Sequence, residues 1–264
     1  MKVAAVQMIS GPEVAPNLAT AGRLVAEAAA VGARLVVLPE YFPLIGADDT
    51  ARLAAREREG AGPIQDFLAD AARRHGIWLV GGSIPLFARN PAKLLNTCLV
   101  FDDCGRAVAR YDKIHLFGFR QGEEHYDEAA TIEAGDRVAT VATPAGQVGL
   151  AICYDLRFPE LFRAMSDVDL LVLPAAFTDT TGRAHWELLL RARAVENQCY
   201  VVASAQGGRH PTGRVTHGNS MIVDPWGDIV ARMDKGDGVV TAELDPARIA
   251  EVRASLPALK HRKL

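Results

Sequence analysis

The sequence lacks an excess of charge of either sign and has no long run of apolar residues. Its 264 residues include 29 lysines and arginines against 32 aspartates and glutamates, a formal net charge of −3. This balance excludes the broad basic surface that binds nucleic acid non-specifically. No apolar segment approaches the length of a membrane span, and residues 1–10 are too short for a signal peptide. We expect a cytoplasmic protein with neither nucleic acid nor membrane as a partner.

Cysteine is also scarce, and cofactor motifs are missing. The cysteines, at positions 98, 104, 153 and 199, form no C-x-x-C pair and accompany no histidine cluster, which argues against zinc. The glycine-rich stretches at 81–82 and 207–209 lack the G-x-G-x-x-G frame of a nucleotide site. A reducing compartment would keep the cysteines as thiols. We expect no metal and no organic cofactor.

Strand-like and helix-like segments alternate along the chain, and no Pro/Gly/Ser-rich linker interrupts them. The pattern predicts helices over residues 17–30 (with Asn17 as N-cap), 63–75 (ending at Gly76) and 184–197. It predicts strands over residues 3–9, 34–38, 78–80, 97–101, 107–111, 148–152, 170–173, 200–203, 221–223, 229–233 and 239–243. We expect one α/β domain over residues 1–264, with helices outside layers of sheet.

A faint internal repeat divides the chain into two halves. Three pairs of segments occur in the same order in both: VAAVQM (3–8) with VGLAIC (148–153), RLVVLPEYF (34–42) with DLLVLPAAF (169–177), and the hairpin 96–113 with 219–235. Buried strands often look alike, but the shared D…G…VAR-x-DK frame of the hairpins is harder to dismiss. The repeat predicts two related halves, each building one sheet, stacked face to face with helices outside.

Two polar residues appear where this repeat breaks. Glu40 stands opposite Ala175, and Cys153 stands opposite Met8, each at the end of a predicted strand, where α/β folds form ligand sites. Lys113 ends the first hairpin. Taken singly, these residues suit a loop glutamate, a core cysteine and a surface lysine. Together they supply a base, a nucleophile and a cation for the oxyanion, the set that acyl transfer requires.

The strings VVLPEYF, RYDKIHLF and GLAICYDLRFPELFRAM resemble the three signature blocks of the nitrilase superfamily of carbon–nitrogen hydrolases. The resemblance implies a four-layer αββα sandwich of two mixed sheets with a pseudo-twofold repeat, in a homodimer or larger homo-oligomer. It makes Glu40, Lys113 and Cys153 the catalytic triad. A second catalytic-site glutamate follows the lysine block, and Glu128 matches it better than Glu123 or Glu124.

The segments AHWELLLRARAVENQCYVVASAQGGRH and MIVDPWG resemble the branch of deaminated glutathione amidases, and the ω-amidases, which act on α-keto acid amides such as α-ketoglutaramate, share much of them. The resemblance therefore implies a thiol amidase that converts a small carboxylate-bearing amide into acid plus ammonia through a thioester. A nitrile would suit the same thiolate. Gly118 and Asn219 depart from the usual Asp and His, which leaves the packing of the substrate loops open.

The implied mechanism has Glu40 deprotonating Cys153, while Lys113 and the backbone N–H of Tyr154 hold the oxyanion. Glu128 orients Lys113 or the substrate amide.

Expected substrate contacts are Tyr41, Arg157, Phe177 and Thr178, although Arg157 also suits an ion pair with Glu160. Other arginines, at 191, 193, 209 and 214, suit either a substrate carboxylate or structural pairing. His115 fits a supporting hydrogen bond. A thiol redox protein or a non-catalytic interaction module are the alternatives from other classes.

Overall fold

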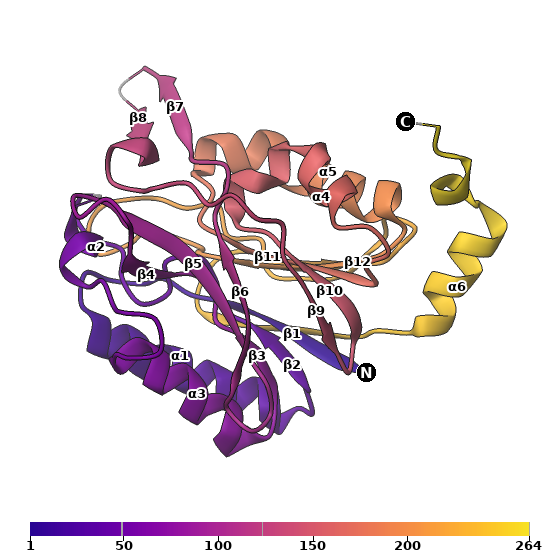
Figure 1. The fold of residues 1–264 in the computed structure, drawn as a ribbon, viewed down its shortest axis with the longest axis horizontal. Coiled ribbons are helices and arrows are strands. Elements are labelled where there is room, and N and C mark those ends of the chain that lie inside the picture. Colours follow the sequence, from indigo (N-terminus) through magenta and orange to yellow (C-terminus); the bar gives the residue numbers. More distant parts are fainter. Residues whose placement is uncertain (49, 123, 264) are drawn as a thin grey trace.

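The computed structural model describes residues 1–48, 50–122 and 124–263 as two sheets stacked face to face (Figure 1). The first sheet has the order β15-β1-β2-β3-β5-β4, and β6 also pairs with β5. Its strands are β1 (Lys2–Gln7), β2 (Leu35–Val37), β3 (Trp78–Val80), β4 (Ile84–Phe87), β5 (Leu94–Phe101), β6 (Ala107–Asp112) and β15 (Gly238–Glu243). Parallel pairing of β1, β2 and β3 combines with antiparallel pairing elsewhere, so the sheet is mixed.

The second sheet has the order β14-β13-β12-β11-β10-β9. Its strands are β9 (Thr140–Thr143), β10 (Gly146–Leu150), β11 (Leu170–Ala175), β12 (Tyr200–Ala205), β13 (Met221–Val223) and β14 (Ile229–Arg232). A separate hairpin of β7 (Gly118–Gln121) and β8 (Glu124–Asp127) projects from the sandwich (Figure 1).

Strand pairing confirms the internal repeat. In the first half β1, β2 and β3 run parallel and β5 and β6 follow antiparallel, and in the second half β10, β11 and β12 run parallel and β13 and β14 follow antiparallel. One part of the prediction was wrong: β15, late in the second half, pairs antiparallel with β1 in the first sheet. The chain therefore ends its sheet structure by closing an edge of the half in which it began.

Helices form the two outer layers (Figure 1). The helices are α1 (Val14–Ala30), α2 (Ala51–Ala54), α3 (Pro63–His75), α4 (Pro159–Ala164), α5 (Asp179–Asn197) and α6 (Pro246–Ser255), with short 3₁₀ turns η1 (Glu128–Ala130), η2 (Cys153–Arg157) and η3 (Ala258–His261). α1 and α3 cover the first sheet, and α4 and α5 cover the second. The predicted helix over 63–75 is confirmed, and Gly76 ends it with a left-handed φ of 58°.

Alternation along the strands divides the core. In β1, Val3 and Ala5 belong to the core between the two sheets, whereas Ala4 and Val6 pack with the residues of α1 and α3. Side chains of a strand point to opposite faces, so a strand covered on both sides is apolar throughout. This is why these segments read as continuous apolar runs.

The predicted N-cap role of Asn17 was wrong. α1 begins at Val14, so Asn17 lies inside its first turn and is buried. Its side-chain amide accepts the Gly11 N–H at 2.8 Å and donates to the carbonyls of Gly11 and Pro43, each at 2.9 Å. Pro16 fits the first turn of α1 because the first N–H groups of a helix have no helical acceptor, and proline lacks an N–H.

In the described parts of the chain, no helix has the length and apolar composition to cross a membrane.

Candidate active site

Cys153 sits at a sharp turn just beyond the end of a strand, close to where the sequence places it. β10 ends at Leu150, and η2 begins at Cys153, whose φ of 51° is left-handed. A non-glycine residue held there costs about 1–3 kcal/mol, which surrounding contacts must offset. One such contact is the Asp155 carboxylate, which accepts the Ile152 N–H at 2.9 Å. The turn presents the sulfur at a strand end, beside N–H groups that have no intrahelical acceptor.

Glu40 and Lys113, far apart in sequence, meet in the interior. Glu40 follows β2 and Lys113 follows β6; their side chains are 1% and 0% exposed, and Nζ lies 2.8 Å from Oε1 of Glu40. The same Oε1 accepts a hydrogen bond from Asn96 Nδ2 at 3.0 Å. Asn96 also fixes the lysine backbone, because its carbonyl accepts the Lys113 N–H at 2.9 Å. The Glu40 carboxylate is therefore oriented by an ammonium and an amide.

Glu128 completes the charge cluster, and it does so through both oxygens. Lys113 Nζ lies 3.0 Å from Oε1 and 2.8 Å from Oε2. The Tyr41 hydroxyl donates to Oε1 at 2.6 Å, and the Phe117 N–H donates to Oε2 at 2.7 Å. Of the three glutamates considered from the sequence, Glu128 thus takes this position; Glu124 instead accepts a hydrogen bond from the Thr180 hydroxyl at 2.9 Å, and Glu123 lies outside the described residues.

Burial and these charges decide the protonation of the site. Burial raises the pKa of the Cys153 thiol well above its ordinary value, and the charge of Glu40 and a thiol–carboxylate hydrogen bond raise it further, against the opposing effect of Lys113. The Lys113 pKa is also raised: burial would lower it, but Glu128 and Glu40 outweigh burial. Lys113 lowers the Glu128 pKa despite that group's burial. The resting site therefore holds a neutral thiol beside an ammonium.

A single pocket exposes this cluster to a ligand. Glu40, Glu128 and Cys153 line it together with Phe117, Tyr154, Arg157, Ala176, Phe177, Thr178, Thr181 and Arg214. Three of the expected substrate contacts, Arg157, Phe177 and Thr178, lie on this wall. Tyr41 does not, because its hydroxyl turns inward to Glu128. Thr178 caps α5 by accepting the Thr181 N–H at 3.2 Å.

Arg157 does not pair with Glu160, contrary to the structural alternative. Its guanidinium carbon lies 5.7 Å from the Tyr154 ring centroid and 5.3 Å from that of Phe177, and Nη1 lies 3.2 Å from His185 Nδ1. No ion pair of Arg157 with a carboxylate occurs in the described structure. By contrast, Arg193 pairs with Glu196 at 2.8 Å, so it is structural.

Sequence reasoning missed a buried carboxylate that links the lysine segment to the cysteine turn. Asp155 accepts the Tyr111 hydroxyl at 2.7 Å and the His115 N–H at 3.1 Å, besides the Ile152 N–H. The His115 ring contacts it through Nδ1 at 2.7 Å and stacks on Phe158 with centroids 3.7 Å apart. The supporting role expected for His115 is thus confirmed.

The two departures from the family pattern lie in different settings. Gly118 begins β7, and a Cβ added there would meet nothing within 4 Å. Asn219 is buried with a left-handed φ of 59°. Its Oδ1 accepts a hydrogen bond from Arg232 Nε at 3.0 Å, and its Nδ2 donates to the His217 carbonyl at 2.8 Å. Neither residue lines the pocket.

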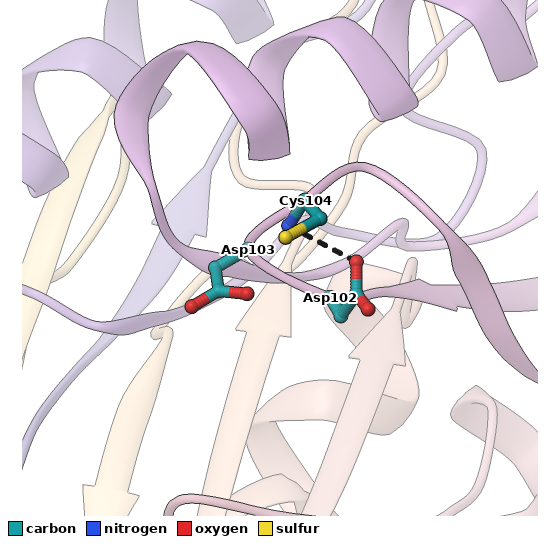
Figure 2. Close-up of side chains that lie close together, drawn as sticks. All are labelled: Asp102, Asp103 and Cys104. Carbon is teal, nitrogen blue, oxygen red and sulfur yellow. Dashed lines mark hydrogen bonds between the residues drawn. The ribbon is translucent and has the colours of Figure 1, made fainter.

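Figure 2 shows another group of potential metal ligands, in the turn between β5 and β6: Asp102, Asp103 and Cys104. Their ligand atoms lie within 4.8 Å of one another. Asp102 Oδ1, however, accepts the N–H groups of Cys104 at 3.0 Å and Arg106 at 2.9 Å, and Oδ2 accepts Arg106 Nε at 2.7 Å. Its oxygens close the hairpin turn, so the group is explained by structure alone.

The stacked sheets with outer helices, and the pocket at the strand ends, match the αββα architecture of carbon–nitrogen hydrolases. The family model described as "Carbon-nitrogen hydrolase" matches residues 2–254. The chain belongs to this family.

Named relatives are similar over nearly the whole chain. The deaminated glutathione amidase of Synechocystis sp. is 42% identical, with 98% of this chain and 97% of the relative covered. The omega-amidase NIT2-A of Xenopus laevis is 39% identical, with 99% and 95% covered. The C. elegans NitFhit protein has a similar structure, with a TM-score of 0.89 and 38% identity; the match covers 99% of this chain and 65% of NitFhit.

Proposed function

We propose that Cys153 is the nucleophile of an amidase reaction in which Glu40 moves the protons. The observation that carries this proposal is the buried contact of Lys113 with both Glu40 and Glu128, the two carboxylates that line the pocket together with Cys153. Because the thiol is neutral at rest, it needs a base at the moment of attack. Glu40 is that base, since Lys113 and Asn96 both bind its Oε1 and leave Oε2 for the thiol proton.

The reaction then runs in two halves. Glu40 takes the Sγ proton as sulfur attacks the amide carbon, and the tetrahedral oxyanion forms. Glu40 returns the proton to the nitrogen, the C–N bond breaks, and a thioester to Cys153 remains. Water attacks the thioester while Glu40 accepts its proton, and the acid leaves with the thiol regenerated. A primary amide releases ammonia, whereas an amide formed with the amino group of a peptide releases that peptide as the amine.

The Lys113 ammonium and the Tyr154 N–H hold the oxyanion in this scheme. In the structure all three Nζ donors point at carboxylate oxygens, one of Glu40 and two of Glu128. Glu128 keeps other donors on both oxygens, from Tyr41 and Phe117. Lys113 therefore turns one donor from Glu128 to the oxyanion without leaving that carboxylate bare. Glu128 acts by positioning Lys113.

The proposed substrate is a small amide that bears a carboxylate, of the deaminated glutathione kind. Arg157 supports this, since its guanidinium lies on the pocket wall between aromatic rings. The second candidate is an α-keto acid amide such as α-ketoglutaramate, supported by the similarity to the Xenopus laevis omega-amidase. We further propose that the protein works in the cytoplasm without metal or organic cofactor.

A direct comparison of substrates tests the acyl specificity. Deaminated glutathione, α-ketoglutaramate and a simple nitrile are each incubated with the protein, and the released acid is measured by mass spectrometry. The proposal expects the highest kcat/KM with deaminated glutathione. A ranking led by α-ketoglutaramate would favour the second candidate, and one led by the nitrile would refute both.

We also propose a homodimer or larger homo-oligomer. Large apolar side chains are exposed on α5, on the neighbouring β13–β14 turn and in β14: Leu188 is 66% exposed, Val195 47%, Trp226 51% and Val230 48%. Residues 188 and 195 lie two helical turns apart on one face of α5. Gly227, beside Trp226, lies close to Val195, so turn and helix form one surface. Large apolar side chains grouped on an exposed surface are typical of a contact between protein chains.

A further inference from the structure

Arg214 lies on the pocket wall, and within residues 1–48, 50–122 and 124–263 no carboxylate forms an ion pair with it. Its guanidinium carbon is 5.3 Å from the Tyr126 ring centroid. Its Nε is buried, and no hydrogen-bond acceptor reaches that atom in the structure as described. A buried N–H without an acceptor is costly, and a ligand oxygen in the pocket would supply that acceptor. The site points to an anionic group on the substrate.

His210, whose backbone N–H donates to the Arg214 carbonyl, adds no negative charge beside the Arg214 guanidinium. His210 is buried, with Nδ1 at 2.9 Å from the Ser10 carbonyl and Nε2 at 2.8 Å from the Thr216 hydroxyl. Burial lowers the pKa of His210, and although the Ser10 contact opposes this, the positive charge of Arg214 lowers it further. The neighbour is therefore a neutral imidazole, and the charge of Arg214 remains available to a ligand.

Arg157 and Arg214 reach the pocket from different parts of the fold. Arg157 ends η2, which begins at Cys153, and its guanidinium packs against Tyr154 and Phe177. Arg214 belongs to the loop after β12 and packs against Tyr126 of β8. Separate ring contacts hold the two guanidinium groups, so each group presents its own donors at the pocket wall.

We infer that Arg214 is a specificity residue that binds a second substrate carboxylate, distinct from the one at Arg157. The inference rests on the proposed amidase function and narrows its substrate class to amides with a carboxylate on each side of the C–N bond. Deaminated glutathione has this arrangement, whereas α-ketoglutaramate has one carboxylate. Arginine suits the role because its planar fork binds a carboxylate through two hydrogen bonds.

The test compares Arg214→Gln and Arg157→Gln with the wild type on three substrates. These are deaminated glutathione and two derivatives, in each of which one carboxylate, on the acyl or on the glycine part, is replaced by a neutral amide. The acid formed is measured by mass spectrometry. Arg209→Gln is the control, because Arg209 is an exposed residue of the same loop and does not line the pocket.

Each variant is expected to lose at least about tenfold in kcat/KM on deaminated glutathione, the scale of one charge-assisted hydrogen bond. Arg214→Gln should match the wild type within about twofold on one derivative, and Arg157→Gln should do so on the other. The inference is overturned if both variants become insensitive to the same derivative, if Arg214→Gln loses equally on all three, or if it loses nothing. If the wild type hydrolyses none of the three but does hydrolyse α-ketoglutaramate, the inference fails and the amidase function stands; if it hydrolyses none of the four, the proposed function itself fails.

Discussion

At the scale of single residues, the site balances charges that are costly to bury. Two carboxylates surround one ammonium, and the thiol stays protonated because burial and Glu40 both disfavour a further anion. Removing any member leaves the others without compensation. This explains why the cluster is hydrogen bonded on every side, by Asn96, Tyr41 and the Phe117 N–H.

Glu40→Gln tests the base. Glutamine retains the shape and can still accept hydrogen bonds from Lys113 and Asn96, but it takes no proton from sulfur. We expect kcat to fall about 10²- to 10⁴-fold, the usual contribution of a general base. Steady-state amide hydrolysis measures this, with the exposed Glu160→Gln as control. A variant that keeps near-wild-type kcat would remove Glu40 from the chemistry.

Glu128→Gln tests the lysine partner through its pH dependence. Lys113 holds the Glu128 pKa below its ordinary value of 4.5, so the ionised carboxylate stabilises the fold above that pH. The stabilisation is lost as the pH falls through the lower pKa of the folded state. We expect the variant to unfold with about 3–5 kcal/mol less free energy at pH 7. Urea titrations should show this difference shrinking below pH 4.5, and a difference constant down to about pH 3 would contradict the ion pair.

At the scale of elements, the site depends on how a turn and a strand end are joined. Asp155 of η2 binds the Tyr111 hydroxyl of β6 and the N–H of His115, two residues after Lys113. One carboxylate thus connects the segment that carries the cation with the turn that carries the nucleophile. The left-handed φ of Cys153 is held within this arrangement.

Asp155→Asn tests this connection. Asparagine replaces one accepting oxygen by a donor, which then faces an N–H or O–H group. Because a buried donor left unsatisfied costs about 1–3 kcal/mol, we expect that loss of stability, together with a lower kcat at little-changed KM. Tyr111→Phe, which removes one donor and keeps the carboxylate, should cost less on both counts. Equal effects of the two variants on kcat would argue that Asp155 does not position Cys153.

The sequence predicted most of these elements but not all of their contacts. Apolar runs and turn residues located the strands that the two halves share, but they missed β4, β9 and the β7–β8 hairpin. The repeat singled out Glu40 and Cys153 as exceptions to it. Asn96 could have been noticed because it stands opposite Asn219 in the repeat. The residues around it in the sequence, however, do not show that its side-chain amide binds Glu40. Asp155 looked like one polar residue among several after Cys153. Such contacts join residues 44 and 56 positions apart, and local patterns do not encode them.

At the scale of the whole molecule, duplication builds the scaffold and asymmetry builds the site. Corresponding strands of the two halves pair in the same order, yet Ala175 stands where the first half has Glu40. The return of β15 to the first sheet escaped prediction because its short strand pattern does not specify which sheet edge it joins. Edge choice depends on which backbone groups remain unpaired after both halves fold.

Assembly offers a test at this scale. Leu188→Lys places a charge in the exposed apolar surface of α5 and the β13–β14 turn, where an interface would have to desolvate it. We expect sedimentation velocity to show a smaller species than the wild type. Val31→Lys, at an exposed position after α1, should sediment like the wild type. If all three proteins sediment as the same oligomer, the contact between subunits lies elsewhere; if all three sediment as monomers, the proposed oligomer is refuted.

The central claim is that the acyl group passes through the sulfur of Cys153. Rapid acid quenching during turnover of the best amide substrate, followed by peptide mass spectrometry, observes that intermediate directly. The account predicts an acyl adduct on the peptide that contains Cys153, retained in Cys104→Ser and lost, together with turnover, in Cys153→Ala. Continued hydrolysis by Cys153→Ala, or an adduct on a different residue, would contradict it.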